Sequence, residues 1–383
     1  MRILQVSGVF CDELGGGVGD YVCSLGTRLI KLGHTVDLVT YSVAPAKRDH
    51  QGLVVHYVPL SSLAGFRYFQ WGRDANRFVR TLQKSAGFDL VHAHTTSMAF
   101  PLYYDSPAPM VITSHGTAID PVHGLLRQLA LSQIERKYYA KAARVIAVSP
   151  SVKQELLLKG IPEILLEVIP NGTDEKRFGT SRLDKKAARE RLGINPNEIA
   201  VLFVGAHTVR KGFRVLLEVI ERTLTSRLGA FKFLVAGKGP LTTSLQRLSN
   251  KHAEVVALGF VPEDTLGLLY VASDVLVFPS LYEGLPTVVL DALGSGLPVI
   301  VSDIPSLRGS LAPDSAIFVQ PNDPDSLFQA LKSIASDPEI LARLAATARS
   351  EAPKYNWDTI VDRVIRVYSD ALRGAEKIVQ NKG

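Results

Sequence analysis

The chain has 383 residues, of which 46% are hydrophobic and 21% charged. This composition is ordinary for globular proteins and excludes an intrinsically disordered chain. At about 150 residues per domain, the length predicts two to three domains. No window approaches the roughly 18 apolar residues of a membrane span, and the first residues lack the apolar stretch of a signal peptide. We therefore expect neither a transmembrane helix nor a cleaved leader.

The net charge is +6, from 43 Lys and Arg against 37 Asp and Glu, and the basic excess gathers in residues 47–86 and 123–144. This sign permits attraction to anionic lipid, phosphorylated ligands or nucleic acid, but no nucleic-acid recognition motif accompanies it. The two cysteines, Cys11 and Cys23, are too few for a disulfide framework and lack metal-ligand spacing. We therefore expect reduced thiols, a cytoplasmic location and no nucleic-acid partner.

Short apolar runs alternate with amphipathic stretches along the chain. The runs are continuous, which is typical of parallel strands covered on both faces. In the first half they lie at 3–6, 35–40, 54–58, 90–94, 110–114, 145–148 and 167–169. In the second half they lie at 200–204, 231–235, 255–258, 275–278, 298–301 and 316–319. Predicted helices between them include 18–31, 126–143, 213–228 and 326–336.

This alternation predicts an α/β fold, and the strands are too many for one open sheet of at most about ten. We expect two Rossmann-like, doubly wound parallel-sheet domains, separated where Pro170, Asn171 and Gly172 punctuate the chain. The predicted domains are 1–172 and 173–355, followed by a helix at 356–383 that packs back across the boundary. Because ligands bind at the carboxyl ends of parallel strands, we expect the site in a cleft between the two domains.

Two loops in the first half follow predicted strands and carry candidate ligand-binding groups. Gly16 and Gly17 precede an apolar helix, where backbone amides and the helix dipole favour an anion. Their spacing matches neither the dinucleotide fingerprint nor a P-loop, and a flexible loop is the alternative. His115 follows the strand at 110–114, placed to bond a sugar hydroxyl or a leaving phosphate unless it is structural. His92 and His94 are interpreted as structural, with a spacing that puts them on alternate faces.

Two cations follow the first predicted strand of the second domain. Arg210 and Lys211 stand before a helix. Arg offers a planar fork and Lys a point charge, a combination that suits a diphosphate. A solvated loop pair is the alternative interpretation.

The loop after the strand at 275–278 is the most informative stretch. It carries Glu283 between glycine and proline residues, and a helix is predicted to begin near Pro286. Amides of Gly284, Leu285 and Thr287 at that helix N-terminus are placed to hold a phosphate. Asp291 lies in the second turn, where its carboxylate is expected to reach ribose hydroxyls.

Several short motifs occur in a fixed order along more than 280 residues. They are Gly-Gly-Gly-Val, Thr-Ser-His-Gly, Ala-Val-Ser-Pro-Ser, Ile-Pro-Asn-Gly-Thr-Asp, Val-Gly with a later Lys-Gly, and Tyr-Glu-Gly-Leu-Pro. Together with the Tyr-Asn-Trp that starts the closing helix, they resemble the family-four retaining glycosyltransferases of GT-B fold, also called group 1 glycosyltransferases. The resemblance covers nearly the whole chain.

The resemblance implies a metal-independent, retaining transferase of hexosyl type, without a cofactor. Its donor would be a nucleotide diphosphate sugar, UDP- or GDP-linked, and its acceptor a hydroxyl in glycolipid, polysaccharide or glycoconjugate biosynthesis. Two other functions stay open: a non-catalytic subunit that binds a nucleotide sugar, and another GT-B enzyme such as a sugar-nucleotide epimerase. A phosphorylase would in addition need pyridoxal phosphate.

The resemblance also implies roles for individual residues. Glu283 matches the first Glu of the family's Glu-x7-Glu pair and would contact the transferred sugar. Asp291 stands at the position of the second Glu, is one methylene shorter, and would contact the ribose. His115 would lie beside the reacting centre. Lys211 would bind the donor phosphate. The family has an arginine as its partner, but this chain has Ala206 at that position, and Arg210 is expected to supply the missing positive charge.

By the same resemblance, Gly16 and Gly17 would contact the donor phosphate and the acceptor. No metal site is predicted, because Asp323 and Asp325 precede a predicted helix and are interpreted as its cap.

The segment at 63–84 mixes aromatic and basic residues. It is interpreted either as a surface that rests on an anionic membrane and receives a lipid-linked acceptor, or as a core-packing helix with a solvated basic face. The first interpretation would add association with the inner face of a membrane to the cytoplasmic location.

Overall fold

The computed structural model describes residues 1–8, 16–42, 47–59, 67–95, 106–116, 135–173, 184–226 and 228–380. The chain forms two compact units, the first from Met1–Asn171 with Trp357–Gly383 and the second from Gly172–Asn356. The first unit thus ends one residue before the boundary expected from the sequence, and the C-terminal helix belongs to it. Within the described ranges, no helix combines the length and apolarity needed to cross a bilayer.

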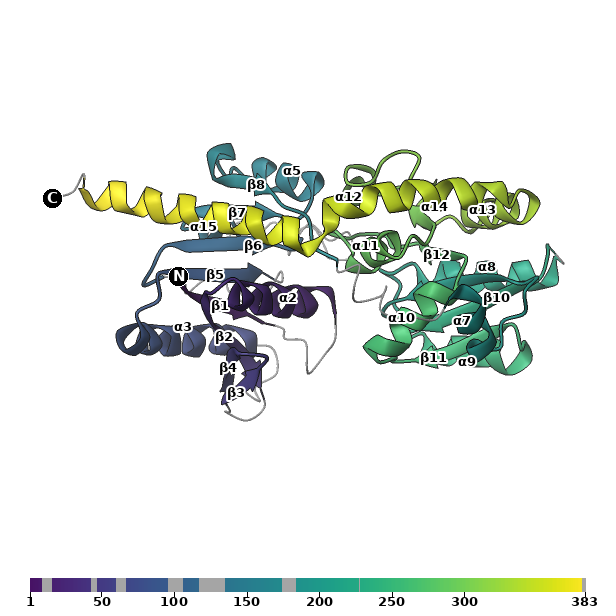
Figure 1. Ribbon diagram of the computed structural model, residues 1–383, viewed down its shortest axis with the longest axis horizontal. Coiled ribbons are helices and arrows are strands. Elements are labelled where there is room, and N and C mark those ends of the chain that lie inside the picture. Colours follow the sequence, from purple (N-terminus) through teal and green to yellow (C-terminus); the bar gives the residue numbers. More distant parts are fainter. Residues whose placement is uncertain are drawn as a thin grey trace. The chain divides into compact units, whose positions relative to one another are not determined.

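The first unit is built on an eight-stranded sheet in the order β3-β4-β2-β1-β5-β6-β7-β8 (Figure 1). The strands are β1 (Arg2–Ser7), β2 (Thr35–Ser42), β3 (Lys47–His50), β4 (Leu53–Pro59), β5 (Leu90–Thr95), β6 (Met110–Ser114), β7 (Arg144–Ala147) and β8 (Leu166–Val168). Neighbours pair in parallel except β3, which runs antiparallel to β4 at the edge. The sequence did not predict β3 because its Lys-Arg-Asp-His has no apolar run, a composition typical of edge strands.

The helices of this unit are α2 (Gly17–Lys31), α3 (Arg67–Ala86), α5 (Pro150–Leu158), the 3-10 turn η1 (Glu163–Leu165) and α15 (Trp357–Gln380). Figure 1 shows α15, the last segment of the chain, lying along β6 and β7. Its buried Trp357, Ile360, Val364 and Tyr368 share one core with Tyr21 of α2. Of the helix predicted at 126–143, residues 135–139 are helical, and 126–134 lie outside the described residues.

The second unit has a six-stranded, parallel sheet in the order β11-β10-β9-β12-β13-β14. The strands are β9 (Ile199–Val204), β10 (Phe231–Ala236), β11 (Val255–Gly259), β12 (Val275–Phe278), β13 (Val299–Ser302) and β14 (Ala316–Val319). Their side chains pack with flanking helices in one core that includes Phe203, Phe213 and Phe233. The predicted α/β fold with two parallel sheets is therefore confirmed.

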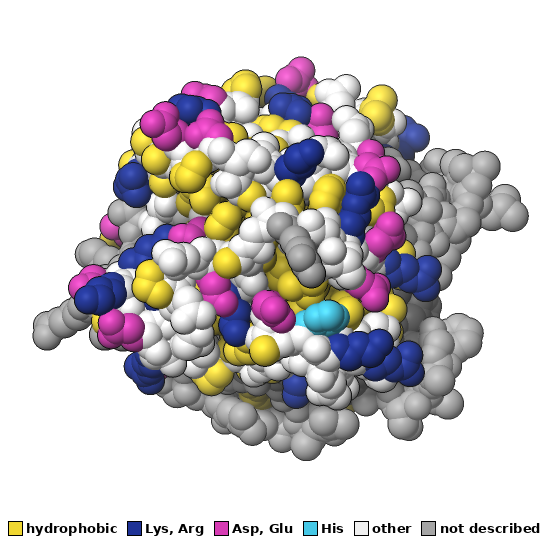
Figure 2. Space-filling view, turned by 90° about the vertical axis from the view of Figure 1, so that its right-hand side faces the viewer, with side chains coloured by type: hydrophobic (Ala, Val, Ile, Leu, Met, Phe, Trp, Pro, Cys, Tyr) yellow, Lys and Arg dark blue, Asp and Glu magenta, His cyan; other side chains and the backbone are white. Residues whose placement is uncertain are grey.

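The helices of the second unit are α7 (Lys185–Leu192), α8 (Phe213–Thr225), α9 (Thr242–Lys251), α10 (Glu263–Ala272), α11 (Thr287–Gly294), α12 (Pro305–Arg308), α13 (Pro324–Ser336), α14 (Glu339–Glu351) and the 3-10 turn η2 (Ala352–Tyr355). Asp323 caps α13, accepting from the backbone N–H groups of Asp325 and Ser326 at 2.9 and 3.1 Å. The cap interpretation of this Asp-x-Asp is confirmed. On the face drawn in Figure 2, acidic and basic side chains are interspersed, as on an ordinary solvated surface.

One expectation about the cysteines is wrong. Cys23, buried on α2, is disulfide-bonded. Cys11 lies outside the described residues. The count of two cysteines excludes a framework of several bridges, but it does not establish a reduced thiol at Cys23.

Candidate active site

Two loops of the second unit lie directly against each other at the carboxyl ends of β9 and β12. The backbone carbonyl of Arg210 accepts a hydrogen bond from Leu281 N at 2.8 Å, and Ser280 Oγ lies 3.1 Å from the same carbonyl oxygen. Gly212 has φ +67°, and a Cβ there would lie 1.8 Å from the carbonyl oxygen of Pro279. No side chain fits in that space, so the approach of the two loops requires glycine at 212.

This approach brings three of the predicted site residues together. Lys211 Nζ lies 2.6 Å from Glu283 Oε1, and Arg210 Nη1 lies 3.6 Å from the same oxygen. Ser280 Oγ also donates to Glu283 Oε1, at 2.6 Å. The Glu283 side chain is 9% exposed and that of Lys211 is 17% exposed. Two cations against one carboxylate leave a net positive charge at this edge of the sheet, which suits an anionic ligand.

Further contacts fix the two cations. Arg210 Nη1 donates to the carbonyl of Tyr282 at 3.1 Å, and Lys211 Nζ lies 5.1 Å from the ring centroid of Phe278. A cation over an aromatic face is held by the ring quadrupole. Sequence reasoning missed Ser280. Its position three residues before Glu283, in the same turn, was the signal that could have indicated a hydrogen bond between the two side chains.

The helix predicted after Glu283 is α11, with Pro286 as its N-cap and Thr287 as its first residue. Gly284 and Leu285, just before it, are buried. The first N–H groups of a helix have no intrahelical acceptor and carry partial positive charge. The second unit thus places this helix N-terminus and the cations of the neighbouring loop on the same edge of one sheet.

Asp291 lies apart from the loop cations, within the body of α11. It is buried, and its Oδ1 accepts a hydrogen bond from Thr173 Oγ1 at 2.6 Å. Thr173 N in turn donates to the carbonyl of Tyr355 at 2.7 Å. Asp291 therefore anchors the point where the chain enters and leaves the second unit, and its contact with a ribose stays a prediction. Sequence reasoning missed Thr173, because this contact joins residues 118 positions apart.

Sequence reasoning also missed His207, which has a structural role in the loop between β9 and α8. It is fully buried, stacks on Phe213 with ring centroids 4.1 Å apart, and pairs through Nδ1 with Thr242 Oγ1 at 2.9 Å. Burial lowers the pKa of His207 to about 4. A neutral imidazole packed in this way fixes the loop that carries Arg210 and Lys211.

In the first unit, His115 follows the last residue of β6 and joins two other histidines. His115 Nε2 lies 3.5 Å from His94 Nδ1, and the ring centroids of His92 and His94 are 4.1 Å apart. The expectation that His92 and His94 point to alternate faces is wrong, because residues i and i+2 of a strand share a face. His92 is held by Thr113 Oγ1 at 2.7 Å and by the hydroxyl of Tyr368 at 2.6 Å.

All three histidines are neutral at pH 7. Burial lowers the pKa of His92 and of His115 to about 3, and that of His94 well below its usual value. Repulsion from a second charged imidazole would add to this effect for His92 and His94. A neutral His115 offers one donor and one acceptor rather than a positive charge.

The glycines predicted to bind a phosphate lie at the start of α2. Gly16 is the N-cap, with φ +142°, and Gly17 is the first residue; both are exposed. One turn further, the ring of Tyr21 lies 4.9 Å from that of His115. The first unit therefore brings the N-terminus of α2 and His115 to the same edge of its sheet. Among the residues described, no group of three or more His, Cys, Asp or Glu is arranged to hold a metal ion.

Two α/β units, each built on a sheet that is parallel apart from the edge strand β3, have the GT-B fold of glycosyltransferases. Sucrose-phosphate synthase from Thermosynechococcus elongatus has the same fold, with a TM-score of 0.83 at 22% identity over 96% of this chain and 98% of that one. An Anabaena protein, Alr3699/HepE, solved in complex with UDP-glucose, gives a TM-score of 0.74 at 17% identity over 96% of this chain and 99% of that one.

Sequence comparison gives the family. Residues 15–177 match the model described as Glycosyltransferase Family 4, and residues 198–337 match the model described as Glycosyl transferases group 1. An uncharacterized glycosyltransferase of Methanocaldococcus jannaschii is 30% identical over 97% of this chain and 99% of its own. A glycogen synthase of Mycobacterium tuberculosis is 29% identical over 98% of this chain and 96% of its own. The chain belongs to the group 1 glycosyltransferases.

Proposed function

We propose that this glycosyltransferase moves a hexosyl unit from a UDP- or GDP-linked sugar to an acceptor hydroxyl, with retention at the anomeric carbon and without a metal ion. The observation that carries the proposal is the cluster of Arg210, Lys211 and Glu283 beside the N-terminus of α11. The similarity to a protein solved with UDP-glucose supports a nucleotide-sugar donor. The similarity to a glycogen synthase supports an acceptor in polysaccharide synthesis, with glycolipid and glycoconjugate acceptors as the other members of the proposed class.

Departure of the nucleoside diphosphate builds negative charge on its phosphate oxygens. Arg210, Lys211 and the backbone N–H groups of Gly284, Leu285 and Thr287 would stabilise that charge as it develops, since fixed donors need no reorganisation during the reaction. Gly16 and Gly17 would add the exposed N-terminus of α2. No bound metal is then required to neutralise the leaving group.

The other groups would orient the sugar. Glu283, held by Lys211 and Ser280, would accept hydrogen bonds from sugar hydroxyls, and a neutral His115 would both donate and accept. The bond from the anomeric carbon to the phosphate oxygen breaks, and the acceptor oxygen bonds the anomeric carbon on the same face. The acceptor proton passes to the departing phosphate. Asp291 would contact the ribose.

The test begins with a thermal-shift panel of UDP, GDP, ADP and their sugars to select the donor, because a ligand that binds the native state raises its Tm. With that donor, we expect Lys211→Ala and Glu283→Ala each to lower kcat by about 10²–10³-fold. Arg247→Ala, an exposed change on α9, is the matched control and should retain wild-type turnover. EDTA should leave the rate unchanged, and NMR of the product should show the donor's anomeric configuration.

Near-normal turnover in both Lys211→Ala and Glu283→Ala would contradict the proposal. If the wild-type protein binds the donor with neither transfer nor hydrolysis, the non-catalytic subunit is the correct function. Conversion of the donor to its epimer without an acceptor would instead identify an epimerase.

We also propose peripheral contact with an anionic membrane, through α3. Arg73, Arg77, Arg80 and Lys84 are exposed and spaced by four, three and four residues, which puts them on one face of the helix. The aromatic part of that expectation changes, because Trp71 is fully buried. Residues 63–66 of the segment lie outside the described residues. Contact through the described basic face of α3 would bring the protein to a lipid-linked acceptor.

A further inference from the structure

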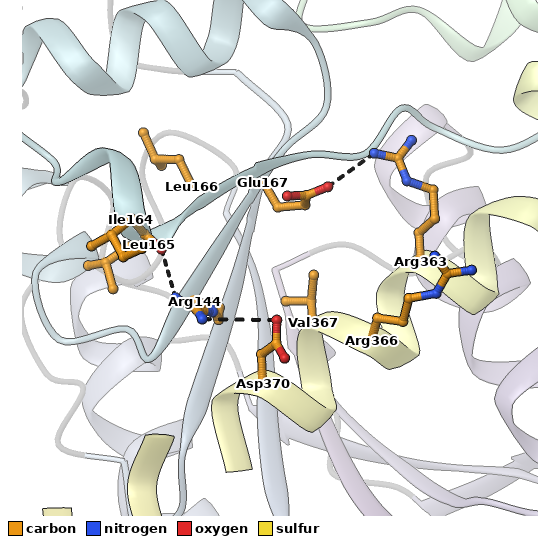
Figure 3. A pocket seen from close by; sticks show the side chains of 9 residues that line it. All are labelled: Arg144, Ile164, Leu165, Leu166, Glu167, Arg363, Arg366, Val367 and Asp370. Atoms are coloured by element: carbon orange, nitrogen blue, oxygen red, sulfur yellow. Dashed lines mark hydrogen bonds and ion pairs between the residues drawn. The ribbon is translucent and has the colours of Figure 1, made fainter. Parts of the chain in front are cut away.

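A cavity of about 290 Å³ lies in the first unit (Figure 3). It is bounded by η1, the start of β7, β8 and α15. Arg144 is the first residue of β7 and Leu166 the first of β8, whereas His115 follows the last residue of β6. Since these strands are parallel, the cavity lies at the amino ends of the strands and His115 at the carboxyl ends. The cavity is therefore separate from the candidate active site.

Three guanidinium groups line the cavity: those of Arg144, Arg363 and Arg366. Two carboxylates face them, and both are engaged. Glu167 Oε1 lies 3.2 Å from Arg363 Nη2. Asp370 is shared between Arg144, at 3.9 Å, and Arg373 outside the cavity, at 2.5 Å.

Arg366 has no hydrogen bond or ion pair with any residue that the structure describes, and it is exposed. Its charge is uncompensated, so the cavity carries a net positive charge. This charge favours an anionic ligand, as for other basic recesses.

The backbone holds two of the three guanidinium groups in place. Arg144 Nη1 donates to the carbonyl of Ile164 at 2.7 Å, and Arg363 Nη2 donates to the carbonyl of Val168 at 2.5 Å (the close-up in Figure 3 shows the first of these). A guanidinium has five N–H donors, so each keeps donors for a further acceptor. Side chains already fixed lose little conformational entropy when a ligand binds, which favours affinity.

The volume is about ten times the roughly 30 Å³ share of one water molecule, and it is close to the lower limit of ligand pockets, about 300 Å³. A lone ion would leave most of it unfilled. Ile164 and Val367 line the same cavity, and Ile164, which is 78% exposed, offers apolar surface to a carbon skeleton.

The planar fork of arginine matches the oxygens of a phosphate group. We propose that this cavity binds the phosphomonoester of a small soluble metabolite, of the size of a hexose phosphate. This site is independent of the donor diphosphate and of the proposed transfer reaction.

The test uses the full chain with methyl-labelled Ile and Val, titrated with glucose 6-phosphate and followed by NMR. The methyl signals of Ile164 and Val367 should shift with saturation. Arg366→Ala should weaken the affinity by at least about tenfold, because a charge-assisted contact is lost, and Arg366→Lys should weaken it less. Arg247→Ala is the matched control and should bind as the wild type does. Arg366 is exposed and unpaired, so its variants should fold, which an unchanged Tm verifies.

Several results would overturn the proposal: no shift of these methyl signals, an equal shift in Arg366→Ala, or equal affinity for glucose or sulfate. Vesicles of phosphatidylcholine with phosphatidic acid form a second arm, because a lipid headgroup presents the same phosphate. A shift of the methyl signals with vesicles but not with glucose 6-phosphate would also overturn the assignment of a soluble ligand. Lys211→Ala should leave the titration unchanged, so this proposal and the proposed transfer reaction can fail separately.

Discussion

Gly212 shows how a single backbone position controls the candidate active site. It lies next to Lys211, and its Cα hydrogen faces the carbonyl of Pro279 in the neighbouring loop. Through this contact Arg210, Lys211 and Glu283 are brought within ion-pair distance. The position therefore affects both the stability of the second unit and the placement of its charges.

We expect Gly212→Ala to destabilise the second unit by at least about 3 kcal/mol, from backbone strain at positive φ and from the steric conflict with Pro279. Urea unfolding followed by far-UV circular dichroism measures this change. Gly374→Ala on α15, where a Cβ meets nothing within 4 Å, is the control and should be neutral or stabilising by up to about 1 kcal/mol. Equal stability of Gly212→Ala and wild type would show that the loops separate without cost.

The residues of the candidate site were predictable to the extent that local patterns reveal them. Lys211, Glu283 and His115 follow strands in loops that a sequence reader can place. Ser280 and Thr173 were not predicted, because a hydroxyl gains its role from a partner distant in sequence or hidden in a turn. Asp291 was placed correctly on a helix, but its buried bond to Thr173 depends on tertiary packing.

At the scale of elements, α3 separates the two interpretations of the basic segment. Trp71 belongs to the core, while the cations occupy the exposed face. The helix thus packs as a core element, and Arg73, Arg77, Arg80 and Lys84 form a basic stripe along its exposed face.

We expect the protein to sediment with vesicles of phosphatidylcholine and phosphatidylglycerol at low salt, and to be released at about 0.5 M salt, where charge is screened. The triple change Arg73→Ala, Arg77→Ala and Lys84→Ala should weaken binding about a hundredfold, at about 1 kcal/mol for each charge. Arg247→Ala is the single-charge control on another surface. Absence of sedimentation at low salt, or sedimentation that resists high salt, would count against the basic stripe.

The strands show why element prediction succeeded where it did. Each continuous apolar run predicted from the sequence is a strand, because buried parallel strands need apolar residues on both faces. The strand β3 was missed because an edge strand with charged residues carries no such signal. The order of strands within each sheet was not predicted, since it depends on contacts between distant segments.

For the whole molecule, the buried histidines predict a loss of stability in mild acid. His92 and His94 are fully buried with lowered pKa values, about 3 for His92. Between the unfolded pKa, about 6.5, and the folded value, the unfolded state binds protons that the folded state excludes. Stability is therefore fully present above pH 6.5 and falls as the pH decreases, by up to about 1.4 kcal/mol per pH unit for each histidine.

Tryptophan fluorescence measures this effect in the first unit, because both tryptophans of the chain, Trp71 and Trp357, are buried there. The urea midpoint should be lower at pH 5 than at pH 7. His92→Gln should reduce the difference, since one titrating group is removed. A midpoint that is the same at both pH values would show that these histidines do not control acid stability.

The first unit is assembled from the beginning and the end of the chain, with the continuous second unit between them. During synthesis on the ribosome, the second unit emerges entire and can fold while the first still lacks α15. Until Trp357, Ile360 and Tyr368 leave the exit tunnel, the apolar partners that they cover, Tyr21 among them, stay open to water and to chaperones. The usual vectorial order is thus reversed: the half of the protein that is translated first is the last to be completed.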